Sequence, residues 1–218
     1  MNYELIKVCG MRYADNIRAV EALGIDLMGF IFWPRSPRCV SERPAYLPTH
    51  CRRVGVFVDA GQDFVLRTAR DYSLSHLQLH GHESPAYLRS LRHSLAGDDS
   101  PIVTPAASII KAFSIATAAD LAQTDHYAGL ADLFLFDTKG ASIGGNGHQF
   151  DWSVLDAYHG PTPFLLSGGI GPADTERLKA FHHPHCIGID LNSRFETEPG
   201  RKDVAALSSL LSHTRTNK

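Results

Sequence analysis

The stretch Leu133-Phe134-Leu135-Phe136-Asp137-Thr138 is a continuous apolar run that ends in a carboxylate. Strands buried on both faces, as in a parallel sheet, have this composition, whereas half-exposed strands alternate apolar and polar residues. Ile6-Lys7-Val8-Cys9-Gly10 and Pro163-Phe164-Leu165-Leu166-Ser167-Gly168-Gly169 follow the same plan and end in a thiol and a pair of glycines. The three stretches predict parallel strands that carry functional groups at their carboxyl ends.

Eight such runs are spread along the chain, with amphipathic stretches between several of them. This alternation implies a parallel sheet, and eight units in 218 residues favour a closed (β/α)8 TIM barrel over an open doubly wound sheet. No G-x-G-x-x-G follows the first run, which weakens the dinucleotide-binding alternative. The predicted strands are Leu5–Cys9, Leu27–Phe32, Arg53–Val58, His76–His80, Ile109–Phe113, Leu133–Asp137, Pro163–Ser167 and Cys186–Asp190.

Helical periodicity is clearest after the first strand, where it stops at Gly24. A helix over Glu42–Leu47 has poor support because Pro44 interrupts it, and Gly97–Ser108 is expected to be a loop on the far side of the barrel. The predicted helices are Ala14–Leu23, Asp63–Tyr72, Pro85–Leu95, Pro172–Phe181 and Val204–Ser212.

Composition fits one globular domain over residues 1–218, with 44% hydrophobic residues and a formal charge of −2. The charge argues against a nucleic-acid partner, and no apolar run reaches the roughly 18 residues of a membrane span. The four cysteines, Cys9, Cys39, Cys51 and Cys186, have no zinc-site spacing, so we expect reduced thiols in the cytoplasm. A monomer and a homodimer are both compatible with the sequence.

Two strand ends carry candidate proton-transfer groups. Lys7 and Cys9 share a strand face, and an ammonium beside the thiol would favour the thiolate as a general base; a buried structural cysteine is the alternative. Asp137 follows an apolar run, where partial burial would raise its pKa and suit it to proton donation. Its alternative role is that of a capping or salt-bridged residue, held by Thr138 or Lys139.

Two glycine clusters could bind a phosphate through backbone N–H groups. Gly144, Gly145 and Gly147 follow the sixth predicted strand, Gly168 and Gly169 follow the seventh, and Ser193 follows the eighth. The loops after strands seven and eight are the usual phosphate site of such barrels, although glycines also serve simple tight turns.

Three further polar residues are expected to line the site. Gln78 and His80 share a face of the fourth strand, and Asp190 ends the eighth. The loop of residues 32–38 offers two arginines, either of which could take a carboxylate or stay solvated. The histidines are not spaced as metal ligands, so we expect no metal.

Several segments together resemble the phosphoribosylanthranilate isomerase family of tryptophan biosynthesis. The likeness runs in order from residue 6 to about residue 203. The matching stretches are Lys7-Val8-Cys9-Gly10-Met11, residues 29–38, Val54–Val58, Leu77-Gln78-Leu79-His80-Gly81, Phe136-Asp137-Thr138, Gly144-Gly145-Asn146-Gly147, Phe150-Asp151-Trp152, Leu166-Ser167-Gly168-Gly169-Ile170, Asp190-Leu191-Asn192-Ser193 and Pro199-Gly200-Arg201-Lys202-Asp203.

The resemblance implies a TIM barrel that performs an Amadori rearrangement of N-(5-phosphoribosyl)anthranilate without cofactor or metal. By this likeness Cys9 is the general base, Asp137 the general acid and Arg38 the ligand of the anthranilate carboxylate. The glycines after strands seven and eight, with Ser193, bind the phosphate, and Asp190 assists by orienting the substrate amine. Two positions depart from the family pattern: Arg194 replaces a common glycine, and Cys39 replaces a common aromatic residue.

Three other functions stay open from the sequence. A ribulose-phosphate epimerase or related phosphosugar barrel would need metal ligands at strand ends, and a non-catalytic barrel would keep only the anion site. A dual-substrate isomerase, acting also on a histidine-pathway aminoaldose, typically uses two aspartates, which Cys9 disfavours. Sensitivity to a chelator separates the epimerase from the cofactor-free isomerase.

Overall fold

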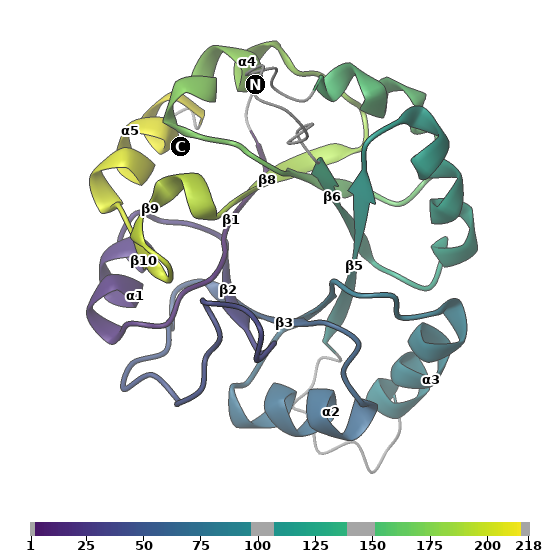
Figure 1. Cartoon of the computed structure of the whole chain (residues 1–218), viewed down its shortest axis with the longest axis horizontal. Coiled ribbons are helices and arrows are strands. Elements are labelled where there is room, and N and C mark those ends of the chain that lie inside the picture. The colour runs from purple at the N-terminus through teal and green to yellow at the C-terminus, as the bar shows by residue number, and fades with distance from the viewer. Residues whose placement is uncertain (1–2, 97–106, 139–150, 215–218) are drawn as a thin grey trace.

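Eight parallel strands close into a barrel in which each strand pairs with the next along the chain and β8 pairs with β1 (Figure 1). The computed structural model describes residues 3–96, 107–138 and 151–214. The (β/α)8 prediction is confirmed, and each strand lies within a few residues of its predicted bounds. The strands are β1 (Leu5–Val8), β2 (Leu27–Ile31), β3 (Arg52–Phe57), β4 (His76–Leu79), β5 (Ser108–Ile115), β6 (Leu133–Thr138), β7 (Phe164–Ser167) and β8 (Cys186–Leu191).

Helices surround the barrel and cover the outer faces of the strands (Figure 1). A two-stranded antiparallel hairpin follows β8. The remaining elements are α1 (Ala14–Glu21), α2 (Gln62–Asp71), α3 (Pro85–Ala96), α4 (Thr175–Ala180) and α5 (Val204–Thr214), the 3₁₀ segments η1 (Ala118–Tyr127), η2 (Trp152–Ala157), η3 (Pro172–Asp174) and η4 (Ser193–Phe195), and the hairpin strands β9 (Glu196–Glu198) and β10 (Arg201–Lys202).

Two apolar clusters fill the fold, and strand alternation separates them. The inner cluster fills the barrel and includes Ile110 and Ala112 of β5 and Leu133 and Leu135 of β6. The outer, larger cluster packs the other strand faces against the helices. Leu133 and Leu135 of β6 point into the barrel, and Asp137, two residues after Leu135, lies on the same face of the strand. Its side chain therefore reaches the mouth of the barrel at the carboxyl ends of the strands.

The helical predictions are confirmed for α1, α2, α3 and α5, with small differences at their ends. Residues 32–51, all within the described part of the chain, contain no helix, in line with the interruption at Pro44. The helix predicted over Pro172–Phe181 is split into η3 and α4, because Asp174 accepts a hydrogen bond from the Gly171 N–H at 2.8 Å and tightens the first turn. Most of the predicted loop at Gly97–Ser108 lies outside the described residues, and Ser108 begins β5. Among the described helices, none is both long and apolar enough to cross a membrane.

Candidate active site

A pocket of about 180 Å³ opens at the carboxyl ends of the strands, where barrel enzymes carry their chemistry. It contains most of the residues that the sequence singled out. The walls are formed by Cys9, Ile31, Val56, Gln78, His80, Asp137, Ser167, Gly168, Gly169, Ile170, Asp190, Asn192 and Ser193.

The floor beneath Cys9 is a buried ion pair between neighbouring strands. Lys7 of β1 stands in register with Asp190 of β8, and its Nζ lies 2.8 Å from Asp190 Oδ1. The Ser167 hydroxyl donates to the other carboxylate oxygen at 3.2 Å. Burial opposes the charge of Lys7, but Asp190 and Cys9 outweigh it and raise the pKa of Lys7. Lys7 therefore stays an ammonium directly below the pocket.

Cys9 is 3% exposed and lies above this pair. Gly29 on β2 makes room for it, since a Cβ at that position would stand 2.6 Å from the Cys9 sulfur. Burial raises the pKa of the thiol, Lys7 and Lys202 lower it and Asp190 raises it, so that the pKa is raised overall. Lys7 thus lowers the pKa of Cys9 as expected, but burial, together with Asp190, outweighs that effect.

A short polar chain links the walls formed by β4 and β6. The side-chain amide of Gln78 lies 2.9 Å from His80 Nδ1, measured from Nε2. On the other side of the ring, His80 Nε2 lies 3.5 Å from Asp137 Oδ2. Asp137 and His80 are each about one-third exposed, so both reach the open pocket.

Arg38 does not line the pocket surface; its guanidinium is held at the edge by Glu196. Nε lies 2.9 Å from Oε1 and Nη2 lies 2.6 Å from Oε2, which leaves the Nη1 edge outside this bidentate pair. Glu196 also accepts from Lys202 Nζ at 2.6 Å. Gly10, at φ +80°, permits the close approach of Arg38, whose Cδ would stand 2.8 Å from a Cβ at residue 10.

The opposite end of the pocket is lined by backbone and small residues. Gly168 and Gly169 both have positive φ, at +94° and +68°, and Ser193 begins η4 beside them. The guanidinium of Arg194 lies over this loop, with Nη2 3.7 Å from where a Cβ of Gly169 would stand. None of the ion pairs between described residues involves Arg194.

The structure thus brings eight predicted residues together in one pocket: Cys9, Gln78, His80, Asp137, Gly168, Gly169, Asp190 and Ser193. Lys7 lies below it and Arg38 beside it, whereas Gly144, Gly145 and Gly147 fall outside the described residues. Sequence reasoning missed Asn192 as a wall residue and Glu196 and Lys202 as partners of Arg38. Asn192 and Lys202 both stand in stretches already noted, whereas Glu196 carried no local signal. In the described ranges no group of three or more His, Cys, Asp or Glu side chains is placed to hold a metal ion.

Comparisons with known proteins agree with this geometry. The family model described as N-(5'phosphoribosyl)anthranilate (PRA) isomerase matches residues 6–213. A protein of Phocaeicola vulgatus named N-(5'-phosphoribosyl)anthranilate isomerase is 47% identical over 97% of this chain and 98% of its own length. One of the same name from Zymomonas mobilis is 36% identical over 96% and 97%.

Solved structures give the same result. Phosphoribosyl anthranilate isomerase from Thermotoga maritima superposes with a TM-score of 0.77 at 27% identity, covering 98% of both chains. A second isomerase structure, in complex with reduced 1-(o-carboxyphenylamino)-1-deoxyribulose 5-phosphate, has a TM-score of 0.75 at 25% identity, again over 98% of both chains. The family match over most of the chain, the close relatives and the shared barrel show that this chain belongs to the N-(5'-phosphoribosyl)anthranilate isomerase family.

Proposed function

We propose that this protein is an aldose–ketose isomerase that converts N-(5-phosphoribosyl)anthranilate to 1-(2-carboxyphenylamino)-1-deoxyribulose 5-phosphate in tryptophan biosynthesis. The observation that carries the proposal is the pocket itself, which offers a thiol from β1 and a carboxyl group from β6, three strands apart around the closed barrel. A proton donor and a proton acceptor on separate walls suit a rearrangement that moves protons at two sites of one sugar.

In the proposed reaction, protonated Asp137 gives its proton to the furanose ring oxygen. The ring C–O bond breaks as the anthranilate nitrogen forms a Schiff base with C1′. The thiolate of Cys9 then removes the C2′ proton, and the electron pair neutralises the iminium to give an enolamine. Tautomerisation of the enolamine yields the ketone, so that no electrons leave the substrate.

The raised pKa of Cys9 is compatible with this step. The iminium forms next to the thiol, and a new positive charge at short range favours the thiolate. Lys7 and Lys202 already act in the same direction. The base is therefore activated by the intermediate whose proton it removes.

The two anionic ends of the substrate match the two ends of the pocket. The Nη1 edge of Arg38, left open by Glu196, would take the anthranilate carboxylate. The phosphate would bind the loop of Gly168 and Gly169 and the start of η4 at Ser193, with Arg194 supplying a positive charge. Asp190 would orient the substrate amine.

The test is the loss of anthranilate-type fluorescence when the purified protein meets phosphoribosylanthranilate made in situ. We expect a rate well above the spontaneous one and unchanged by a chelator. A rate equal to the spontaneous one would remove the isomerase proposal, and a rate abolished by the chelator would favour a metal-dependent phosphosugar epimerase.

Location and assembly belong to the same proposal. The four cysteines are unpaired, which supports a reducing compartment such as the cytoplasm. One solved relative is described as a set of monomers generated from a dimeric isomerase of Thermotoga maritima, so that a monomer and a homodimer both fit this barrel. Sedimentation velocity at micromolar protein would separate them.

A further inference from the structure

A second buried ion pair lies behind the wall that carries His80. Lys111 follows Ile110 and precedes Ala112, both inward-facing, so its side chain leaves β5 on the outer face. It is 2% exposed, and its ammonium lies 3.2 Å from Glu83 Oε2, with Glu83 itself 4% exposed. This pair takes no part in the proton transfers proposed above.

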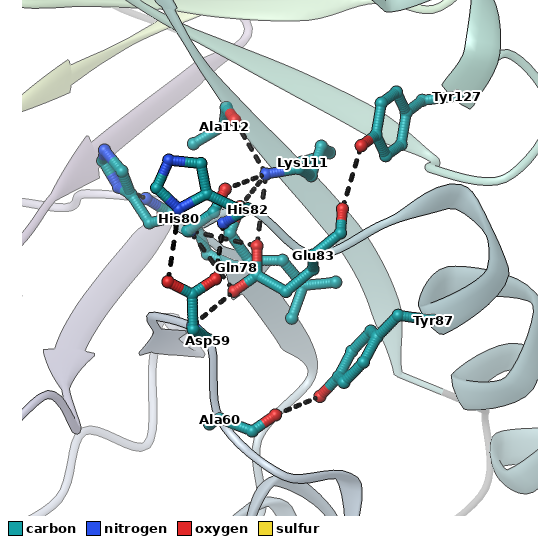
Figure 2. A network of polar contacts seen from close by, with 12 residues as sticks. Asp59, Ala60, Gln78, His80, His82, Glu83, Tyr87, Lys111, Ala112 and Tyr127 are labelled. Carbon is teal, nitrogen blue, oxygen red and sulfur yellow. Dashed lines mark hydrogen bonds and ion pairs between the residues drawn. The ribbon is translucent and has the colours of Figure 1, made fainter.

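The ammonium binds the backbone on both sides of His80. Lys111 Nζ donates to the carbonyl oxygen of Leu79 at 3.2 Å and to that of Gly81 at 2.8 Å. Leu79 and Gly81 are the chain neighbours of His80, and Figure 2 shows the Lys111 side chain reaching across to this segment. One cation therefore fixes the peptide on either side of the histidine.

Glu83 completes the arrangement from the other direction. Its carboxylate accepts from the Asp59 N–H, in the loop after β3, at 2.9 Å (Figure 2). It also accepts from the Gly81 N–H at 3.0 Å. The Tyr127 hydroxyl donates to the Glu83 carbonyl oxygen at 2.9 Å. The turn that follows His80 is thus joined to the loop after β3, to β5 and to η1.

We infer that Lys111 and Glu83 are positioning residues: together they hold His80 where its Nε2 meets Asp137, the proposed proton donor. The inference rests on the proposed function, since it concerns the same site. The geometry favours a role in positioning because two of the ammonium's hydrogen bonds fall on the backbone directly before and after a pocket residue. A misplacement of about 1 Å at such a residue lowers a rate by up to about 100-fold.

Replacing both Lys111 and Glu83 by neutral residues separates an effect on the position of His80 from an effect on the stability of the fold. Lys111→Met alone would leave Glu83 buried and unpaired, and that variant is expected to fold poorly. Lys111→Met combined with Glu83→Gln buries no unpaired charge and keeps a side chain that can accept from Gly81 and Asp59, so it is expected to melt well above Lys111→Met alone. The matched control is Leu207→Ala, a core truncation on α5 that destabilises the barrel away from β4 and β5.

We expect the paired variant to lose about 10- to 100-fold in kcat at a temperature where it is fully folded. The Leu207→Ala control, also assayed while folded, should keep a kcat close to that of the wild type. A paired variant with wild-type kcat would overturn the inference.

A double-mutant cycle with His80→Asn tests the route of the effect. If the pair acts through His80, replacing it in the His80→Asn background lowers kcat by less than about 2-fold. An equal loss in both backgrounds would show that the pair acts on the site by another path, and the inference would be wrong.

A failure of the proposed function can be told apart from a failure of the positioning role, because the wild type would then be inactive in the same assay. In that case NMR tests whether Lys111 and Glu83 hold His80 beside Asp137. The ring signal of His80 should shift on Asp137→Asn in the wild-type background and no longer respond in the paired variant. An unchanged response in the paired variant would overturn the inference without reference to activity.

Discussion

Removing the Lys7 ammonium tests the role of its charge in the site by two measurements, the melting temperature and the pH dependence of kcat/KM. Lys7 is fully buried and lies 2.8 Å from Asp190, so Lys7→Met leaves a buried carboxylate without its cation. Breaking a buried pair in this way costs about 3–5 kcal/mol. For a chain of 218 residues, each kcal/mol lowers Tm by about 2–4 °C, so we expect a loss of roughly 10 °C.

The same variant should move the acid limb of kcat/KM to higher pH, because Lys7 lowers the pKa of Cys9. Lys7→Met with Asp190→Asn removes the unpaired carboxylate and should recover most of the lost stability. It also removes the charge that raises the pKa of Cys9, so its limb should lie between those of the wild type and the single variant. Thermal melts and pH–rate profiles of the three proteins supply the data. A single variant with a Tm loss under about 3 °C and an unmoved limb would refute the reasoning.

Other changes give simpler expectations. Arg38→Ala should mainly raise KM, and steady-state kinetics with an unchanged KM would reject its carboxylate role. Arg194→Gly should raise KM and weaken competitive inhibition by inorganic phosphate by at least about 10-fold, since a charge-assisted contact is worth about 1.5–3 kcal/mol; equal inhibition constants would contradict this. Burial, assisted by Arg52, lowers the pKa of His76 to about 4. Because the unfolded pKa is about 6.5, the free energy of unfolding should be undiminished above pH 6.5 and fall by up to about 3 kcal/mol as pH drops to 4. Urea unfolding would measure that fall, and His76→Gln should reduce it.

The strands could be predicted because burial on both faces leaves a mark in the local sequence. Phe134 and Phe136 face the helices while Leu133 and Leu135 fill the barrel, which requires an unbroken apolar run. The 3₁₀ segments η1 and η2 have no comparable pattern, and the sequence predicted no helix there. Strand ends then placed Cys9 and Asp137 correctly at the mouth, because parallel strands in a barrel all end on one side.

The partners of site residues were harder to foresee, because barrel closure brings together residues that are distant in sequence. Arg38 and Glu196 are 158 positions apart, and only the folded chain shows that the guanidinium is already engaged. The direction of the Cys9 pKa shift depended first on burial and then on Asp190, which meets β1 only when the barrel closes. A local signal did exist for Lys111, since a lysine inside the run of β5 indicates a buried pair, but it did not identify Glu83.

The central claim is that Cys9 and Asp137 carry the two proton transfers. The most direct test is the fluorescence assay under saturating substrate with the wild type, Cys9→Ala and Asp137→Asn, each shown by circular dichroism to be folded. We predict that either substitution lowers kcat by at least about 100-fold, the lower range for loss of a general acid or base. Turnover near that of the wild type in either variant would contradict the role assigned to that residue.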